Sequence, residues 1–121
     1  MELPREFLGV ADPQAWAAEA RRVGKIVVWV PRSVRSKEKL FGLFAAALRF
    51  PNYCGRNWDA LEECLCDLSW LPADAQIALV HERFPFGESE NRQIYKEILR
   101  CACRRSDGRV LQVVWPEEVH P

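Results

Sequence analysis

Residues 50–71 read FPNYCGRNWDALEECLCDLSWL and contain the most clearly delimited helix of the 121-residue chain. Pro51 and Gly55 mark a turn, because proline fixes its own φ and glycine tolerates φ values that other residues avoid. Asn57 then suits the N-cap position, since its side-chain oxygen can accept a hydrogen bond from a free N–H of the first helical turn. The stretch therefore predicts a turn followed by a helix.

This helix has one apolar side and one acidic side. Its apolar side chains recur at spacings of three and four residues, which places them on one helical face, and they are Trp58, Leu61, Leu65 and Leu68. The carboxylates fall together on the other side, and they are Asp59, Glu62, Glu63 and Asp67. Asp59 lies in the first turn, where the positive end of the helix dipole favours a carboxylate. We expect the apolar side to be buried.

The acidic side is a candidate contact surface. A stripe of charges on a helix is usually a solvated surface. Here, however, Arg56 is the only base within residues 50–71, so the acids have no cation to pair with at i,i+4 and they repel one another. Tyr53 stands beside them, and an aromatic ring next to unpaired charge is typical of an interface anchor. These features favour a surface that receives a partner.

The overall composition fits one soluble globular domain, with 49% hydrophobic and 28% charged residues. The formal net charge is zero, which argues against direct nucleic-acid binding, because that function needs a basic surplus. The charges are unevenly spread. Residues 50–71 hold four acids and one base, whereas residues 32–49 hold five bases and one acid. An acidic patch on a balanced protein attracts a basic partner.

No apolar run reaches the length of a membrane span, and the first ten residues lack a basic segment followed by an apolar core. We therefore expect a cytoplasmic protein that does not interact with membranes. An odd number of cysteines in such a chain argues against a disulfide framework, and the two C-x-C pairs do not have the spacing of zinc ligands. We expect small buried apolar side chains at all five, which are Cys54, Cys64, Cys66, Cys101 and Cys103.

The remainder of the chain predicts an α/β fold. Three apolar runs are too short for helices and are typical of buried parallel strands, at residues 25–31, 76–82 and 110–115. Helices are expected between them, because parallel strands need crossover connections, at residues 36–49, 58–71 and 88–105. The expected architecture is a three-stranded parallel sheet packed with helices, with two helices in the first crossover.

An N-terminal extension precedes this unit. Residues 7–10 are a candidate for a short strand. A helix follows, with Asp12 at the N-cap, Pro13 at the first helical position and Gly24 just past the end. Its apolar side should comprise Trp16, Ala20 and Val23. We expect residues 1–24 to form an extension with one helix and residues 25–121 to form the main domain.

Catalysis is not expected. His81 lies inside a predicted strand and is interpreted as a core or edge residue, and there is no Gly-rich phosphate loop and no H-x-x-x-H motif. The carboxylates would serve as an acid/base pair or as ligands of a hard cation only if a concave pocket with a second polar element faced them. The sequence indicates only a helix surface, so we expect no metal and no cofactor.

The run F-P-x-Y-x-G-x-N-W-D-A-L-x-x-C-L, which begins at Phe50 and ends at Leu65, resembles the signature of the barstar family of small intracellular ribonuclease inhibitors. The order of predicted elements from residue 25 is also similar to that of the family. The resemblance implies a cytoplasmic immunity or antitoxin protein, monomeric when free, that blocks the basic active site of a toxic ribonuclease. Carboxylates on a helix would occupy that site as a mimic of RNA phosphates.

The resemblance also implies which residues contact the partner. Four positions match the family motif in place, and they are Tyr53, Asn57, Trp58 and Asp59. Glu63 stands at the position of the family's central aspartate and carries the same charge one methylene further out. Glu62 replaces a tryptophan and Asp67 replaces a small glycine, so an interface tuned to one nuclease would not survive unchanged. The resemblance also implies a further acid from the last helix, for which Asp107 is the candidate.

A different function remains as the alternative. The chain would then be a barstar-fold adaptor or regulator that binds another basic protein, with the N-terminal helix contributing to the contact.

Overall fold

The computed structural model of the protein describes residues 7–105 and 109–117. Helices and strands alternate along most of the chain, as expected of an α/β fold. In chain order the elements are β1 (Phe7–Val10), α1 (Pro13–Arg22), β2 (Ile26–Val30), α2 (Lys37–Ala47), α3 (Trp58–Asp67), β3 (Ile77–His81), α4 (Glu90–Arg105) and β4 (Val110–Pro116).

The strands form one parallel sheet in the order β1-β4-β3-β2. The predicted three-stranded sheet was wrong by one strand, because β1 pairs with β4 in a register that sets Phe7 opposite Val113. A segment of four residues carries too little periodicity to be assigned to a sheet from sequence alone. Its place is determined by the free edge of β4, which lies more than 100 residues away in the chain.

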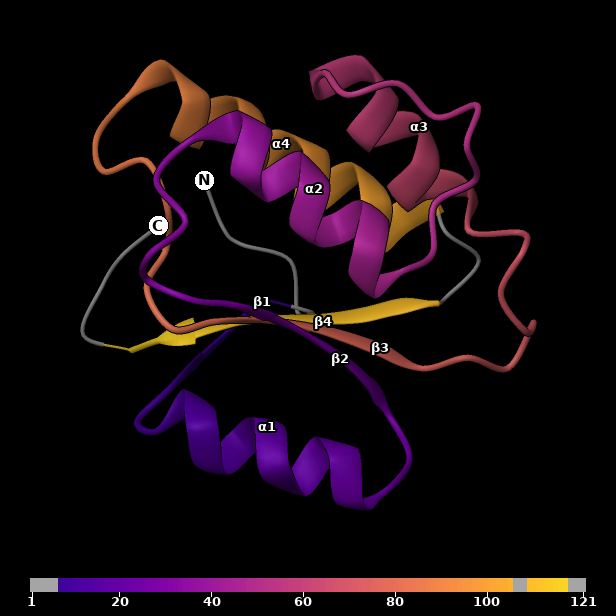
Figure 1. Ribbon diagram of the computed structural model, residues 1–121. Coiled ribbons are helices and arrows are strands. Elements are labelled where there is room, and N and C mark those ends of the chain that lie inside the picture. The colour runs from indigo at the N-terminus through magenta and orange to yellow at the C-terminus, as the bar shows by residue number, and fades with distance from the viewer. Residues whose placement is uncertain (1–6, 106–108, 118–121) are drawn as a thin grey trace.

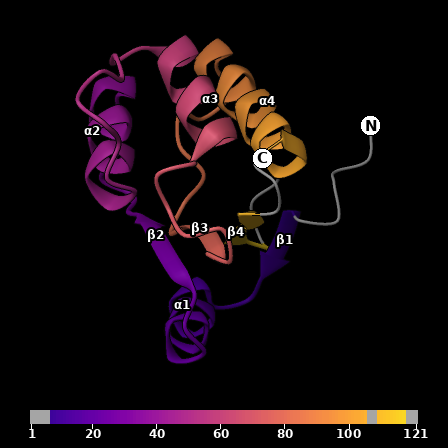
Figure 2. The same cartoon turned by 90° about the vertical axis from the view of Figure 1, so that its right-hand side faces the viewer.

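The helices lie in two layers. Figures 1 and 2 show α1 on one face of the sheet and α2, α3 and α4 on the other. The larger core lies between the sheet and these three helices and includes Leu40, Phe44, Leu65, Leu79 and Tyr95. A smaller core lies between the sheet and α1 and consists of Ala17, Ala78, Val80 and Val114. Every residue of β3 is buried, because both faces of this interior strand are covered.

The predicted helix starts are confirmed by their caps. Asp12 accepts a hydrogen bond from Ala15 N at 3.1 Å and Ser36 accepts one from Lys39 N at 3.2 Å. The predicted apolar side of α1 was wrong at one position, because Val23 is 55% exposed. Val23 is the C-cap residue, and Gly24 turns the chain there with φ of 93°, so the helix ends before Val23 could face the sheet.

His81 and Tyr95 form a polar pair inside the larger core, and both are fully buried. Tyr95 donates to His81 Nε2 at 2.7 Å, and His81 Nδ1 donates to the backbone oxygen of Val114 at 2.9 Å. This assignment follows because a backbone oxygen only accepts. Burial lowers the pKa of His81 to about 4, so its ring is neutral at physiological pH. The interpretation of His81 as a core residue is confirmed.

The N-terminal segment is integrated with the rest of the chain. Within the described residues, β1 lengthens the sheet and α1 covers one of its faces. The division at residue 24 stays a prediction about domain organisation. Across residues 7–105 and 109–117, the structure contains no helix that is both long enough and apolar enough to cross a membrane.

Candidate functional site

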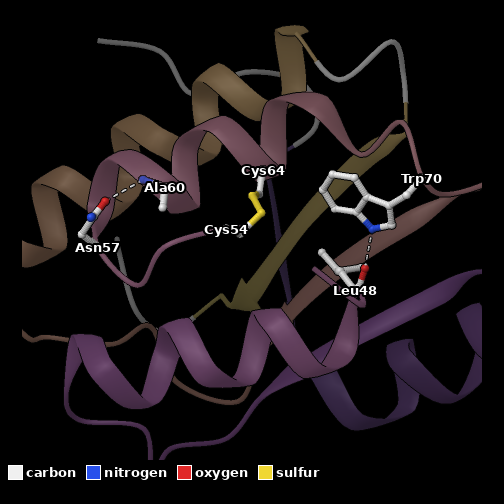
Figure 3. Close-up of a disulfide and its surroundings, with 6 residues drawn as sticks. All are labelled: Leu48, Cys54, Asn57, Ala60, Cys64 and Trp70. Carbon is white, nitrogen blue, oxygen red and sulfur yellow. Dashed lines mark hydrogen bonds between the residues drawn. A yellow bond between two sulfur atoms is a disulfide. The ribbon is translucent and has the colours of Figure 1, made fainter. Parts of the chain in front are cut away.

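Residues 51–57, which we call the contact loop, connect α2 to α3 and are held at their first end by aromatic packing. Phe50 N donates to Ala45 O at 2.9 Å, which closes the end of α2. Trp70 Nε1 donates to Leu48 O at 2.9 Å, and its ring meets Phe50 edge-on with 5.8 Å between centroids. Figure 3 shows Trp70 reaching from beyond α3 to the end of α2. The contact loop therefore starts from a fixed point.

A disulfide joins Cys54 of the contact loop to Cys64 of α3 (Figure 3). The expectation of small unpaired cysteines was therefore wrong for these two residues. An odd cysteine count argues against a multi-bridge framework, but it does not exclude one local bridge across ten residues. Cys66, Cys101 and Cys103 are not joined in disulfides and are half-buried. At its second end the loop is fixed by Asn57, whose side chain caps α3 by accepting from Ala60 N at 2.8 Å.

The acidic side of α3 faces solvent, and we call it the acidic face. Asp59, Glu63 and Asp67 are exposed and Glu62 is half-buried. None of the ion pairs found within the described part of the chain includes any of these four carboxylates. Tyr53 is 80% exposed, an unusual position for so large an apolar ring. The acidic face thus forms no ion pair among the described residues and has an aromatic side chain beside it.

A groove of about 460 Å³ runs between the contact loop, the acidic face and the end of α4. Its wall includes Tyr53, Glu62, Glu63 and Asp67, so the structure brings four of the predicted site residues together. The full lining is Tyr53, Cys54, Gly55, Ala60, Glu62, Glu63, Cys64, Cys66, Asp67, Trp70 and Arg105. The sequence indicated only a helix surface, and the concavity arises because the loop is tied back onto the helix.

The other three predicted site residues lie outside this groove. Asp59 is exposed at the start of α3, whereas Asn57 uses its side-chain oxygen for the helix cap. Trp58 is half-buried and packs edge-on against Phe41 and Phe86, with ring centroids 5.0 and 5.8 Å away. Its Nε1 donates to Asn91 Oδ1 at 3.4 Å. Asn57 and Trp58 therefore fix the start of α3, and Asp59 is the one of the three that presents charge to solvent.

Arg105 and Cys66 are groove residues that the sequence analysis missed. A hydrogen bond with the Cys101 side chain raises the pKa of Arg105, and the nearby carboxylate of Glu62 acts in the same direction. Burial raises the pKa of Cys66 to about 11, helped by neighbouring Cys101, so this thiol stays protonated at physiological pH. No sequence signal pairs the end of α4 with α3, because the contact depends on how the two helices pack. The guessed Asp107 lies outside the described residues.

The groove combines charged and aromatic side chains. Among residues 7–105 and 109–117 there is no group of three or more His, Cys, Asp or Glu side chains placed to hold a metal ion. His81 is fully buried and therefore cannot reach a molecule in the groove. The groove offers three carboxylates, two aromatic side chains and one guanidinium. The charged groups can form charge-assisted hydrogen bonds and ion pairs with a protein surface.

Most of the chain, including the groove, matches a known protein family. A family model described as Barstar (barnase inhibitor) matches residues 25–115, which include the contact loop, α3 and Arg105. No curated protein and no solved structure matches the chain. Since the matched residues make up well over half of the sequence, the chain belongs to the barstar family.

Proposed function

We propose that this protein is a barstar-like inhibitor, an immunity or antitoxin protein that binds the basic active site of a ribonuclease and blocks it. The observation that carries the proposal is the acidic face, where four carboxylates that form no ion pair in the described structure stand beside exposed Tyr53. Membership of a family described by barnase inhibition supports the same function. We propose further that it acts in the cytoplasm and is monomeric when free.

The chemistry is one of charge replacement. A ribonuclease holds the phosphates of RNA with cationic side chains, and carboxylates at matching positions form charge-assisted hydrogen bonds to the same groups. Asp59 and Glu63 lie one helical turn apart on α3, so they present two charges to one partner surface. Tyr53 would supply the apolar anchor beside them. Because the four carboxylates form no ion pair within the described structure, cations of a partner would lower the repulsion among them.

The test is a titration of a basic ribonuclease with the purified protein at low and at physiological salt. We expect stoichiometric inhibition that weakens as salt rises, because exposed charges are screened. Asp59→Ala and Glu63→Ala should each weaken inhibition by at least tenfold, since truncating one partner of an interfacial charge pair costs about 2 kcal/mol or more. Asp74→Ala removes an exposed acid outside the groove and serves as the matched control. Unchanged inhibition by both site variants would contradict the proposal.

Arg105 favours a second candidate function. A guanidinium in the groove makes its charge mixed, and a surface evolved only to replace phosphates has no use for a cation there. The candidate is an adaptor or regulator of the same fold that binds a basic protein other than a nuclease. Capture of a basic protein that depends on Glu63 and Arg105, without inhibition of any ribonuclease tested, would favour it.

A further inference from the structure

A second cleft, of about 450 Å³, lies where β2 and β3 end. These strands are parallel neighbours, with Val30 opposite His81, so the segments that follow them leave the sheet at the same edge (Figure 1). In open α/β sheets this carboxyl edge is the usual place for ligands. We call it the carboxyl-edge cleft, and it is lined by Arg32, Val34, Arg35, Arg83, Phe84, Pro85, Phe86 and Gly87.

The lining carries an excess of positive charge. Arg32 is paired with Glu82, whose carboxylate accepts from Arg32 N at 2.9 Å and from Arg32 Nε at 3.1 Å. Arg35 and Arg83 are exposed, and within residues 7–105 and 109–117 neither has an acidic partner. Arg35 comes from the segment after β2, and Arg83 comes from the segment after β3. The cleft therefore offers two available guanidinium groups, one on each side.

Arg92 contacts two of the residues that line the cleft. Arg92 is only 8% exposed, donates from Nη1 to Gly87 O at 2.8 Å, and holds its guanidinium carbon 5.3 Å from the centre of the Phe84 ring. Burial lowers the pKa of Arg92, and Arg83 acts in the same direction while Glu88 opposes them. Arg92 thus holds the segment that follows Arg83 in the chain, and it adds a buried cation to the same edge of the sheet.

We propose that the carboxyl-edge cleft binds a small phosphorylated ligand, with Arg35 and Arg83 gripping its phosphate oxygens from two sides. A guanidinium forms two parallel hydrogen bonds to a phosphate group, and one dianionic phosphate can accept such bonds from two guanidinium groups at once. The volume lies within the range of small-molecule sites, and buried Val34 and Phe84 provide apolar surface for the remainder of the ligand. This site lies outside the acidic groove and goes beyond the proposed function, so either can fail without the other.

The experiment is an NMR titration of the whole protein with pyrophosphate, ADP and adenosine at constant ionic strength. We expect saturable shifts of the backbone amides of residues 32–36, 83–84 and 86–88 with pyrophosphate and ADP, and none with adenosine. Arg35→Gln and Arg83→Gln should each weaken the binding of pyrophosphate by about tenfold or more, because each removes a hydrogen-bonding partner of a charged group. Arg21→Gln, at an exposed arginine on α1, is the matched control and should bind as the original protein does.

Three outcomes would overturn the proposal. Shifts that rise linearly with pyrophosphate and spread over the whole surface would show only general screening of charge. An equal effect of Arg21→Gln and Arg83→Gln would show that net charge, rather than the cleft, governs binding. Adenosine that binds as tightly as ADP would show that phosphate is not recognised. The first and third outcomes are measured on the original protein alone, so the proposal can be overturned even if a variant does not fold.

Discussion

Cys54 is bonded to Cys64, so the contact loop is covalently tied to the middle of the helix that it precedes. Tyr53 and Gly55 flank the bonded residue and both line the acidic groove. The shape of the groove therefore depends on a bond between its two walls. This makes the candidate site partly preorganised, and a partner that uses the groove loses less free energy in ordering the loop.

Reduction of this disulfide should destabilise the protein. The bridge closes a loop with a sequence separation of 10 residues, for which the chain-entropy estimate is about 3 kcal/mol. Urea unfolding with and without a dithiol reductant measures the difference directly. Cys54→Ser should unfold at the same urea concentration in both conditions, which makes it the control. An original protein whose midpoint does not respond to the reductant would contradict this prediction.

Stability should also fall as the solution becomes mildly acidic. His81 has a pKa of about 4 in the folded protein, against an ordinary value of 6.5. Between these values the unfolded chain binds more protons than the folded one. The contribution of His81 to the free energy of unfolding is therefore fully present above pH 6.5 and is lost as the pH falls from 6.5 through 4. The gap corresponds to roughly 3 kcal/mol. Urea unfolding between pH 5 and 6.5 measures this slope before most carboxylates titrate, and His81→Gln should flatten it. A His81→Gln variant that keeps the original slope would assign the effect to other groups.

Tyr95→Phe tests the same buried pair from its other side. The substitution keeps the ring but removes the hydroxyl that donates to His81 Nε2 at 2.7 Å. Because His81 is fully buried, its nitrogen would lose its partner, and we expect a loss of about 1–3 kcal/mol in the free energy of unfolding. Tyr53→Phe removes a hydroxyl from a ring that is 80% exposed and should change stability little. Equal effects of the two substitutions would show that the buried hydrogen bond contributes nothing specific.

The sequence predicted the parts of the site that depend on local chemistry. The N-cap at Asn57 and the buried stripe of α3 follow from rules that operate within one or two helical turns, and both are present. The parts that it could not predict depend on residues that are distant in the chain. Arg105 reaches the groove only because α4 packs beside α3, and β1 finds its partner only at the free edge of β4. The Cys54–Cys64 bridge was missed because a cysteine count carries no information about which pair meets.

The two ends of the acidic face should respond in opposite directions to the same substitution. Asp59 lies in the first turn of α3, where the helix dipole stabilises a negative charge, and Asp67 is the last residue of that helix, where the dipole opposes one. Asp59→Asn should therefore lower the free energy of unfolding and Asp67→Asn should raise it, each by about 0.3–1 kcal/mol. Both variants are isosteric with the original residue, and both positions are exposed, so packing changes little in either.

Urea unfolding at low salt measures the difference between these two variants, and repeating it in 1 M salt should remove most of it, because the effect is electrostatic. If Asp67→Asn also weakened the inhibition of a ribonuclease, the acid at the end of α3 would be present for binding at a cost to the fold. Such a trade-off is expected where a surface is selected for a partner rather than for stability. A change of the same sign in both variants would contradict the dipole argument and would point to repulsion among the four carboxylates as the dominant effect.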